Sequence, residues 1–159
     1  MFKSENSKPN HACIVDFQNF RYAPPAQDFM FFMYLSTDRE FRRECMRDMI
    51  EFYYREMCDI FKGYHLNPEE ILPYEEFINS CNHYRIYGCL LALNHNPVIC
   101  IPPELLKSMF ADASAVADMI FKDRSPVIRK CWMECEKYRS KIRESIANFV
   151  DLFTELKLL

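Results

Sequence analysis

The chain has 159 residues, with 20 Lys and Arg against 23 Asp and Glu, and a formal charge of −3 at pH 7. Its two glycines, Gly63 and Gly88, lie too far apart to belong to one loop, which excludes a self-contained glycine-rich phosphate-binding loop. The length and the 50% of hydrophobic residues indicate one domain with an ample core, and the slightly acidic balance with dispersed basic residues excludes a nucleic-acid-binding face.

The first 22 residues differ in pattern from the rest of the chain. The run Ala12-Cys13-Ile14-Val15 is short and apolar, contains a β-branched pair and ends at Asp16, so it predicts a short buried strand. An extended Met1-Phe2-Lys3 would form a small hairpin with it around the polar connector Ser4 to Asn10.

Two helices are predicted next. The first begins at Pro25 or Ala26 and runs to Leu35, with Asp28 in its first turn. Thr37 and Glu40 form a capping box that predicts a helix from Asp38 to Lys62, which Gly63 ends. We expect the apolar stripe of this second helix to face the core; its members are Phe41, Cys45, Met49, Phe52, Tyr53, Met57 and Ile60.

The remaining pattern is helical as well. It predicts a helix from about Tyr74 to Leu93 that stops before Pro97, a short helix from Glu104 to Phe110, and one long amphipathic helix from Ser125-Pro126 to about Leu156. The predicted fold class is therefore mainly α with a short N-terminal β element.

The cysteines and the apolar segments suggest a cytoplasmic chain. Eight cysteines occur without a C-x-x-C motif or a secretory leader, so we expect reduced core residues. Cys131 and Cys135 would share a helix face and form an edge of a metal site, but no histidine lies near them in sequence and core packing is favoured. The longest uncharged apolar stretch, Phe29 to Leu35, is far below the roughly 20 residues that a membrane span needs.

Asp16 is the residue whose position suggests chemistry. A carboxylate at the end of a buried strand is held rigidly, and it suits Mg²⁺ that is bound against substrate phosphates. The alternative is a structural role, in which Asp16 caps the turn that follows.

The order of several short motifs resembles a known family. Val15-Asp16-Phe17-Gln18, then Arg21-Tyr22, Pro24-Pro25, Asp28 and Leu35-Ser36-Thr37 are similar to the stretch typical of CHK kinase-like (ecdysteroid kinase-like) proteins, relatives of choline kinases and aminoglycoside phosphotransferases. The similarity is specific from Cys13 to about Cys58. It implies the mostly helical C-terminal lobe of a protein-kinase-like fold, and the transfer of phosphate from ATP with Mg²⁺ to a small-molecule hydroxyl, with ecdysteroids as candidate acceptors.

The resemblance also implies roles for individual residues. Asp16 falls on the family's metal-binding aspartate, which is the counterpart of the Asp in the protein-kinase D-F-G element, and it would therefore also contact the bound ATP through the metal. Asp28 matches an aspartate that we expect to brace the helix after the metal loop. Tyr84, Tyr87 and Trp132 are candidates for the acceptor pocket, although the sequence does not separate pocket aromatics from core aromatics.

The chain departs from the family pattern at its start. The family's catalytic loop, His-Gly-Asp-x-Trp-x-x-Asn, precedes a strand that Met1-Phe2-Lys3 resembles. We therefore expect a truncated chain: a partial kinase-like domain over residues 1–159, with short strands and the metal loop in 1–22 and a helical subdomain in 23–159. Without the catalytic loop and the N-terminal lobe we expect no kinase activity from the chain alone.

Three interpretations follow. The first is the C-terminal lobe of a small-molecule phosphotransferase, either as a fragment truncated at an internal methionine that would need its missing N-terminal lobe or as a true short paralogue. The second is a non-catalytic helical binding module for a small apolar ligand or for a partner protein. The third is an unrelated all-α domain with a C-terminal coiled coil, which the Asp16 region argues against.

Overall fold

The computed structural model describes residues 2–5, 8–12, 22–111 and 113–156 and is mostly helical. The elements in chain order are β1 (Phe2–Glu5), β2 (Lys8–Ala12), α1 (Pro25–Ser36), α2 (Arg39–Gly63), α3 (Pro68–Ile71), α4 (Tyr74–Ile99), α5 (Pro103–Phe110), α6 (Ala113–Phe121), α7 (Ser125–Glu134) and α8 (Glu136–Glu155).

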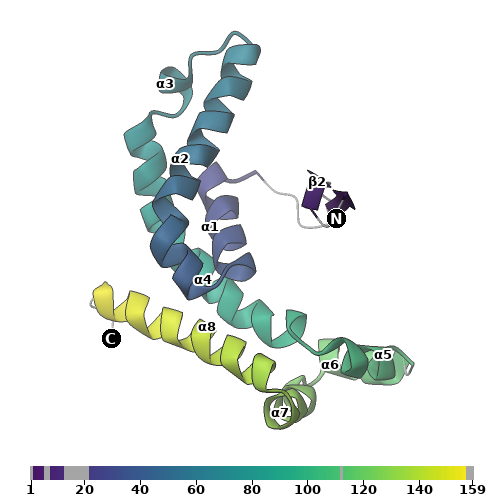
Figure 1. Cartoon of the computed structure of the whole chain (residues 1–159). Helices are drawn as coiled ribbons and strands as arrows, with labels where there is room; N and C mark the ends of the chain where they lie inside the picture. The colour runs from purple at the N-terminus through teal and green to yellow at the C-terminus, as the bar shows by residue number, and fades with distance from the viewer. Residues whose placement is uncertain (1, 6–7, 13–21, 112, 157–159) are drawn as a thin grey trace.

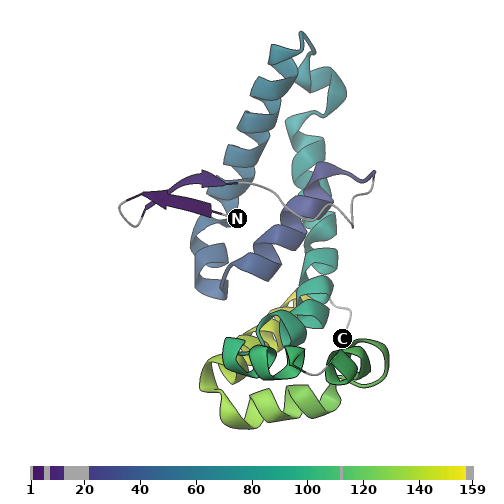
Figure 2. The ribbon, with the colours of Figure 1, turned by 90° about the vertical axis from the view of Figure 1, so that its right-hand side faces the viewer.

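The strands β1 and β2 pair antiparallel as a two-stranded hairpin, with an irregularity between Lys3 and Ser4. In Figure 1 the hairpin lies to one side of the helices, and Figure 2 views the molecule from that side. Positions 13–15 of the strand predicted at residues 12–15 lie outside the described residues, so that part of the prediction stays untested.

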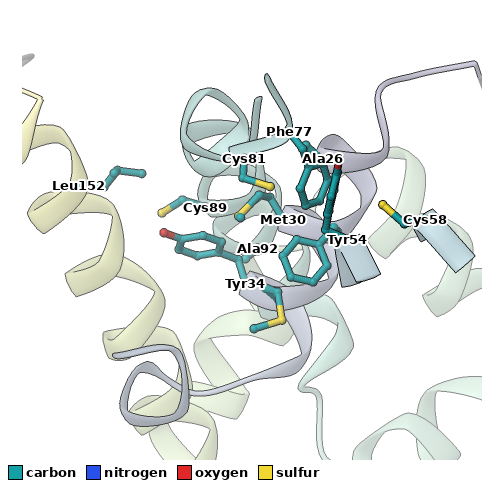
Figure 3. Close-up of a cluster of buried hydrophobic side chains, with 12 residues drawn as sticks. Ala26, Met30, Tyr34, Tyr54, Cys58, Phe77, Cys81, Cys89, Ala92 and Leu152 are labelled. Carbon is teal, nitrogen blue, oxygen red and sulfur yellow. The ribbon is translucent and has the colours of Figure 1, made fainter. Parts of the chain in front are cut away.

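Helix α4 is the longest element and connects the two halves of the helical part. Helices α1 and α8 both pack on it, while α5, α6 and α7 gather beyond its C-terminal end (Figure 1). Two hydrophobic clusters result. The first is drawn in Figure 3 and consists of Ala26, Phe29, Met30, Met33, Tyr34, Tyr54, Cys58, Phe77, Cys81, Cys89, Ala92 and Leu152. The second consists of Ile101, Cys131, Tyr138 and Ile142 with their half-buried neighbours.

The start of α2 lies one residue later than predicted. The side chain of Asp38 accepts a hydrogen bond from the backbone N–H of Phe41 at 2.7 Å and is therefore the N-cap. Thr37 instead ends α1, because both its N–H and its hydroxyl donate to the carbonyl of Met33. The predicted capping box at Thr37 is wrong for this reason.

The end of α2 also differs from the prediction. Gly63 is the last helical residue, and the left-handed conformation that favours glycine occurs at His65, where φ is 60°. The chain leaves the helix through a hydrogen bond from the N–H of His65 to the carbonyl of Lys62. Gly63 is therefore not the residue that turns the chain.

The buried face of α2 follows the predicted stripe only in part. Met49, Tyr53 and Met57 of the stripe pack against the first cluster, whereas Phe41, Phe52 and Ile60 are exposed. The buried residues of α2 are Arg42, Tyr54 and Cys58, which are not members of the stripe. One position along a helix turns the side chain by roughly 100°. The apolar residues of α2 cover more than one face, and the contacts with α3 and α4 decide which face is buried.

Helix α4 continues through Pro97 to Ile99, which the prediction placed in a break. A proline inside a helix removes one hydrogen bond and costs about 3 kcal/mol. Here Pro97 lies in the last turn, and its carbonyl accepts a hydrogen bond from the hydroxyl of buried Tyr138 at 2.8 Å. Packing against α8 therefore holds the last turn of α4 in place.

The long C-terminal helix of the prediction is two helices. Cys135 has an extended backbone, with φ −125° and ψ 110°, and separates α7 from α8. The guanidinium of Arg139 donates to the carbonyls of Trp132 and Met133 at the end of α7, at 2.6 and 3.0 Å, and so stabilises this break. Cys131 and Cys135 consequently do not share one helix face.

Candidate functional site

Asp16, the predicted metal-binding residue, lies outside the described residues. Its role as a metal ligand therefore stays a prediction. The chain is described again from Tyr22, and from there it runs along the rim of a cavity.

The cavity has a volume of about 720 Å³ and lies between the start of α1, the middle of α2 and the C-terminal half of α4. Most of its walls are aromatic or aliphatic. The lining residues are Tyr22, Ala23, Pro24, Pro25, Gln27, Asp28, Phe31, Leu35, Tyr53, Tyr87, Leu91, His95 and Ile99. A cavity of this size with a few polar groups is typical of a small-molecule site.

The two prolines fix the rim of the cavity. Pro24 has φ −57° and ψ 140°, an extended conformation, and its carbonyl accepts the N–H of Gln27 at 2.9 Å. Pro25 occupies the first helical position, where its missing N–H removes no intrahelical bond. Helix α1 therefore starts at the rim, and its first turn brings Asp28 to the cavity.

Asp28 is exposed and makes no hydrogen bond or ion pair with another described residue. Its charge acts on Tyr53: burial raises the pKa of Tyr53, and the nearby Asp28 carboxylate raises it further. The predicted bracing role of Asp28 is thus not carried by a hydrogen bond within the described chain. The favourable interaction with the α1 dipole remains.

His95 supplies the second polar group of the cavity wall. Its Nδ1 lies 2.7 Å from the carbonyl oxygen of Leu91. A carbonyl only accepts, so the neutral ring carries its proton on Nδ1 and leaves Nε2 as an acceptor. The ring of Phe31 meets the imidazole edge-on, with 5.6 Å between the centroids.

The described lining of the cavity carries a negative charge. Asp28 is the carboxylate among the described lining residues, and none of these residues is Lys or Arg. The described polar groups are a carboxylate, the Nε2 acceptor of His95, the Gln27 amide and tyrosine hydroxyls. The described part of the wall therefore offers acceptors and, from the Gln27 amide and the tyrosine hydroxyls, donors, and it includes no cationic side chain.

Sequence reasoning found part of this cavity. Tyr87, a predicted pocket candidate, lines it, whereas Tyr84 packs on the first hydrophobic cluster and Trp132 on the second. His95 and Phe31 were missed. A signal existed, because Tyr87, Leu91, His95 and Ile99 recur at every fourth position and place one histidine on an otherwise apolar helix face.

Among the described residues, no group of three or more His, Cys, Asp and Glu side chains is placed to hold a metal ion. The two glycines of the sequence also provide no glycine-rich phosphate-binding loop.

No helix in the described ranges has both the length and the apolar character that crossing a membrane requires.

Residues 1–77 match the model of the ecdysteroid kinase-like family. Over these residues the chain is similar to that family. The match confirms the resemblance drawn from the motifs around Asp16, and it supports a kinase-like fold and a small-molecule phosphotransferase origin. The matched segment contains α1, α2, α3 and the beginning of α4. It supplies the cavity-lining residues from Tyr22 to Tyr53, and the lining residues from Tyr87 to Ile99 lie after it in the chain. The comparisons with curated proteins and with solved structures gave no match.

Proposed function

We propose that the chain is the helical C-terminal lobe of a small-molecule phosphotransferase that transfers a phosphoryl group from ATP to a hydroxyl. The observation that carries this proposal is the family match over residues 1–77. A mostly helical architecture with a cavity at the start of α1 supports it. An alcohol of the ecdysteroid type is the proposed acceptor.

Within this proposal, residues 1–22 hold the short strands and the metal loop, and residues 23–159 form the helical subdomain. Asp16 would bind the Mg²⁺ that accompanies ATP. Phosphoryl transfer depends on positioning and electrostatic stabilisation by several groups, and one carboxylate does not supply them. We therefore propose that the 159 residues do not catalyse alone and act together with an N-terminal lobe. The buried thiols support a reducing, cytoplasmic location.

The test has two stages. Isothermal titration of the purified chain with Mg-ATP should show no binding tighter than millimolar, and micromolar binding that Asp16→Asn abolishes would contradict the proposed inactivity. Transcript sequencing should then reveal whether a longer product encodes His-Gly-Asp-x-Trp-x-x-Asn upstream of Met1.

Such a longer product should phosphorylate an ecdysteroid, and Asp16→Asn should lower the rate by at least about a hundredfold because the metal ligand is lost. Asp48→Asn, which removes a remote exposed carboxylate of α2, is the matched control and should leave the rate unchanged. If Asp16→Asn retained the full rate, the assignment of the metal ligand would be refuted.

A non-catalytic binding module is the second candidate function. The cavity favours it, because 720 Å³ and an apolar lining suit a small apolar ligand whether or not phosphate is transferred. Ligand binding by the chain with no ATP-dependent activity in any longer product would favour this alternative.

A further inference from the structure

The cavity at the start of α1 has a charge pattern that restricts its ligands. Its described lining combines aromatic and aliphatic walls with one carboxylate, Asp28, and with the acceptor Nε2 of His95. Acceptors in a cavity are satisfied by a ligand that brings donors. An anionic ligand leaves these two acceptors without a donor and meets the Asp28 carboxylate with a like charge, although the Gln27 amide and the tyrosine hydroxyls of the wall can donate to it.

We propose that this cavity is a charge-selective site for a ligand with a flat or alicyclic apolar body that carries a neutral or positively charged hydrogen-bond donor, and that Asp28 excludes anionic forms of the same ligand. The inference rests on the proposed function only in one respect, namely that the ligand would be the phosphate acceptor.

The apolar part of the argument comes from the walls. Phe31, Leu35 and Leu91 present apolar surface from two helices, and the rings of Tyr53 and Tyr87 add aromatic faces. Aromatic faces attract cations as well as apolar rings, because their quadrupole is negative above the ring plane. A ring-bearing alcohol and a ring-bearing ammonium both fit this lining.

The charge part of the argument comes from Asp28. Its carboxylate is exposed and not neutralised by a described basic side chain, so its field acts on a ligand at the rim, although the positive end of the α1 dipole weakens it. In water, the repulsion between two like charges about 4 Å apart costs about 1 kcal/mol, which weakens the binding of a ligand roughly fivefold. Asp28 is thus expected to be a specificity-determining residue.

The discrimination has a consequence for a phosphotransferase. Its acceptor alcohol is uncharged, whereas the phosphate ester that it forms carries negative charge at neutral pH. A site that prefers the uncharged form disfavours the product once the phosphoryl group has been transferred. The same carboxylate would therefore favour release of the product.

A second cavity of about 350 Å³ has mixed charge. Its lining includes Arg39, Arg42, Arg43 and Arg85 together with Asp151 and Glu155. Each of the four arginines is paired with a carboxylate, and the cavity is a second place where a charged probe can bind. The experiment therefore has to report where a probe binds as well as how tightly.

The test uses three probes with the same ring: 2-naphthylmethanol, 2-naphthylmethylamine and 2-naphthoate, which are neutral, cationic and anionic at pH 7. Each is titrated into the ¹⁵N-labelled chain in the absence of ATP, and binding at the cavity is read from the amide shifts of Leu91 and His95. The alcohol and the amine should bind at least about fivefold more tightly than the naphthoate.

Two substitutions test the role of charge. Asp28→Asn should reduce the preference for the alcohol over the naphthoate to less than about twofold. Gln27→Lys, which adds a cation beside Asp28 and so neutralises the described wall, should remove the preference for the amine over the naphthoate. Asp48→Asn removes one charge from an exposed position on α2 that does not line the cavity, so it should change neither ratio.

The outcomes are separable from those of the phosphotransferase test. Equal binding of the three probes at Leu91 and His95, or an unchanged ratio in Asp28→Asn, would overturn the charge selectivity. Absence of binding by all three probes would overturn the cavity as a ligand site. Neither result depends on ATP, so the proposed phosphoryl transfer would stand or fall on its own assay.

Discussion

At Gly88, helix α4 packs directly against the backbone of α1. A Cβ atom at this position would lie 2.6 Å from the carbonyl oxygen of Met30 and 2.8 Å from its carbonyl carbon. Both are backbone atoms of α1 and cannot move without displacing the helix. The contact therefore requires a residue without a side chain, although Gly88 has an ordinary helical conformation.

We predict that Gly88→Ala lowers the free energy of unfolding by about 1–3 kcal/mol, because overpacking between two helix backbones is relieved only by separating them. Denaturant unfolding followed by circular dichroism measures this. Gly63→Ala is the matched control: no atom lies within 4 Å of its added methyl group, and the better helix propensity should raise stability by up to about 1 kcal/mol. Equal effects of the two substitutions would refute the close contact.

The buried thiols of α4 lead to a prediction about alkaline pH. Cys81 and Cys89 lie in the first hydrophobic cluster beside Met30 (Figure 3). Burial raises the pKa of Cys81 from 9.0 to about 12 and that of Cys89 from 9.0 to about 11. The unfolded chain therefore releases these protons at a lower pH than the folded chain does.

The sign follows from proton linkage. Between about pH 9 and pH 12 the folded state binds more protons than the unfolded state, so the free energy of unfolding falls as pH rises, by at most about 1.4 kcal/mol per pH unit for each thiol. Urea unfolding at pH 8, 9, 10 and 11 measures the slope. Cys81→Ala should make the slope shallower, and Cys45→Ala, at a half-buried position on α2, should not. An identical slope in Cys81→Ala would show that this thiol does not contribute.

At the scale of single residues, the sequence indicated the family but only part of the cavity. The order of motifs around Asp16 identified the family because it consists of neighbouring residues. The cavity is formed by residues from α1, α2 and α4, and their assembly depends on how these helices cross. The way the helices cross decides that Tyr87 lines the cavity and that Tyr84 packs against the first cluster.

At the scale of helices, the sequence predicted the spans of several helices, but it did not fully predict which face of α2 is buried. Helices α1, α2 and α5 match their predicted spans within two residues, because prolines and capping residues mark their ends locally. The buried face of α2 and the continuation of α4 through Pro97 depend on contacts with distant helices, as the bond from Tyr138 to Pro97 shows. The sequence pattern within one helix does not indicate which distant helix it will contact.

Helix α8 is connected to α2 through a half-buried ion pair. The side chain of Arg42 is only 6% exposed, its guanidinium lies 3.2 Å from Glu144, and it stacks on the ring of Tyr34 with 4.9 Å to the centroid. Glu144 also receives a bond from Lys141. Removing the carboxylate leaves two cations next to each other in a poorly hydrated place.

We predict that Glu144→Gln lowers the free energy of unfolding by about 1–3 kcal/mol, since Arg42 loses its charged partner but keeps its bonds to the carbonyls at the end of α1. The control is Asp151→Asn. Asp151 lies on α8, as Glu144 does, and the substitution breaks its ion pair with Arg39 of α2. Both side chains of that pair are more than half exposed, at 53% and 54%, and the change should be below about 1 kcal/mol. If both variants lost the same stability, burial of the Arg42 pair would not be the cause.

At the scale of the whole molecule, α4 contributes to both hydrophobic clusters, as does α8. The first cluster includes Phe77, Cys81, Cys89 and Ala92 of α4, and Val98 packs against the second. A continuous helix transmits the folding of one cluster to the other, because its hydrogen bonds form cooperatively. We therefore expect the helical part of the chain to unfold in a single transition.

Asn94→Pro tests this coupling. Asn94 is exposed, lies in α4 between the two clusters, and accepts hydrogen bonds from Arg124 at 2.9 and 3.3 Å. Proline there removes a helix hydrogen bond and clashes with the preceding turn, at a cost of about 3 kcal/mol or more. Asn94→Ala loses the same side-chain contact with Arg124 but keeps the helix intact, so it is the matched control.

Calorimetry measures the coupling. The parent chain and Asn94→Ala should show equal calorimetric and van't Hoff enthalpies, whereas Asn94→Pro should show two transitions or a calorimetric enthalpy that exceeds the van't Hoff value. A single two-state transition in Asn94→Pro would mean that contacts other than α4 couple the clusters, of which the packing of α8 against both is the first to test.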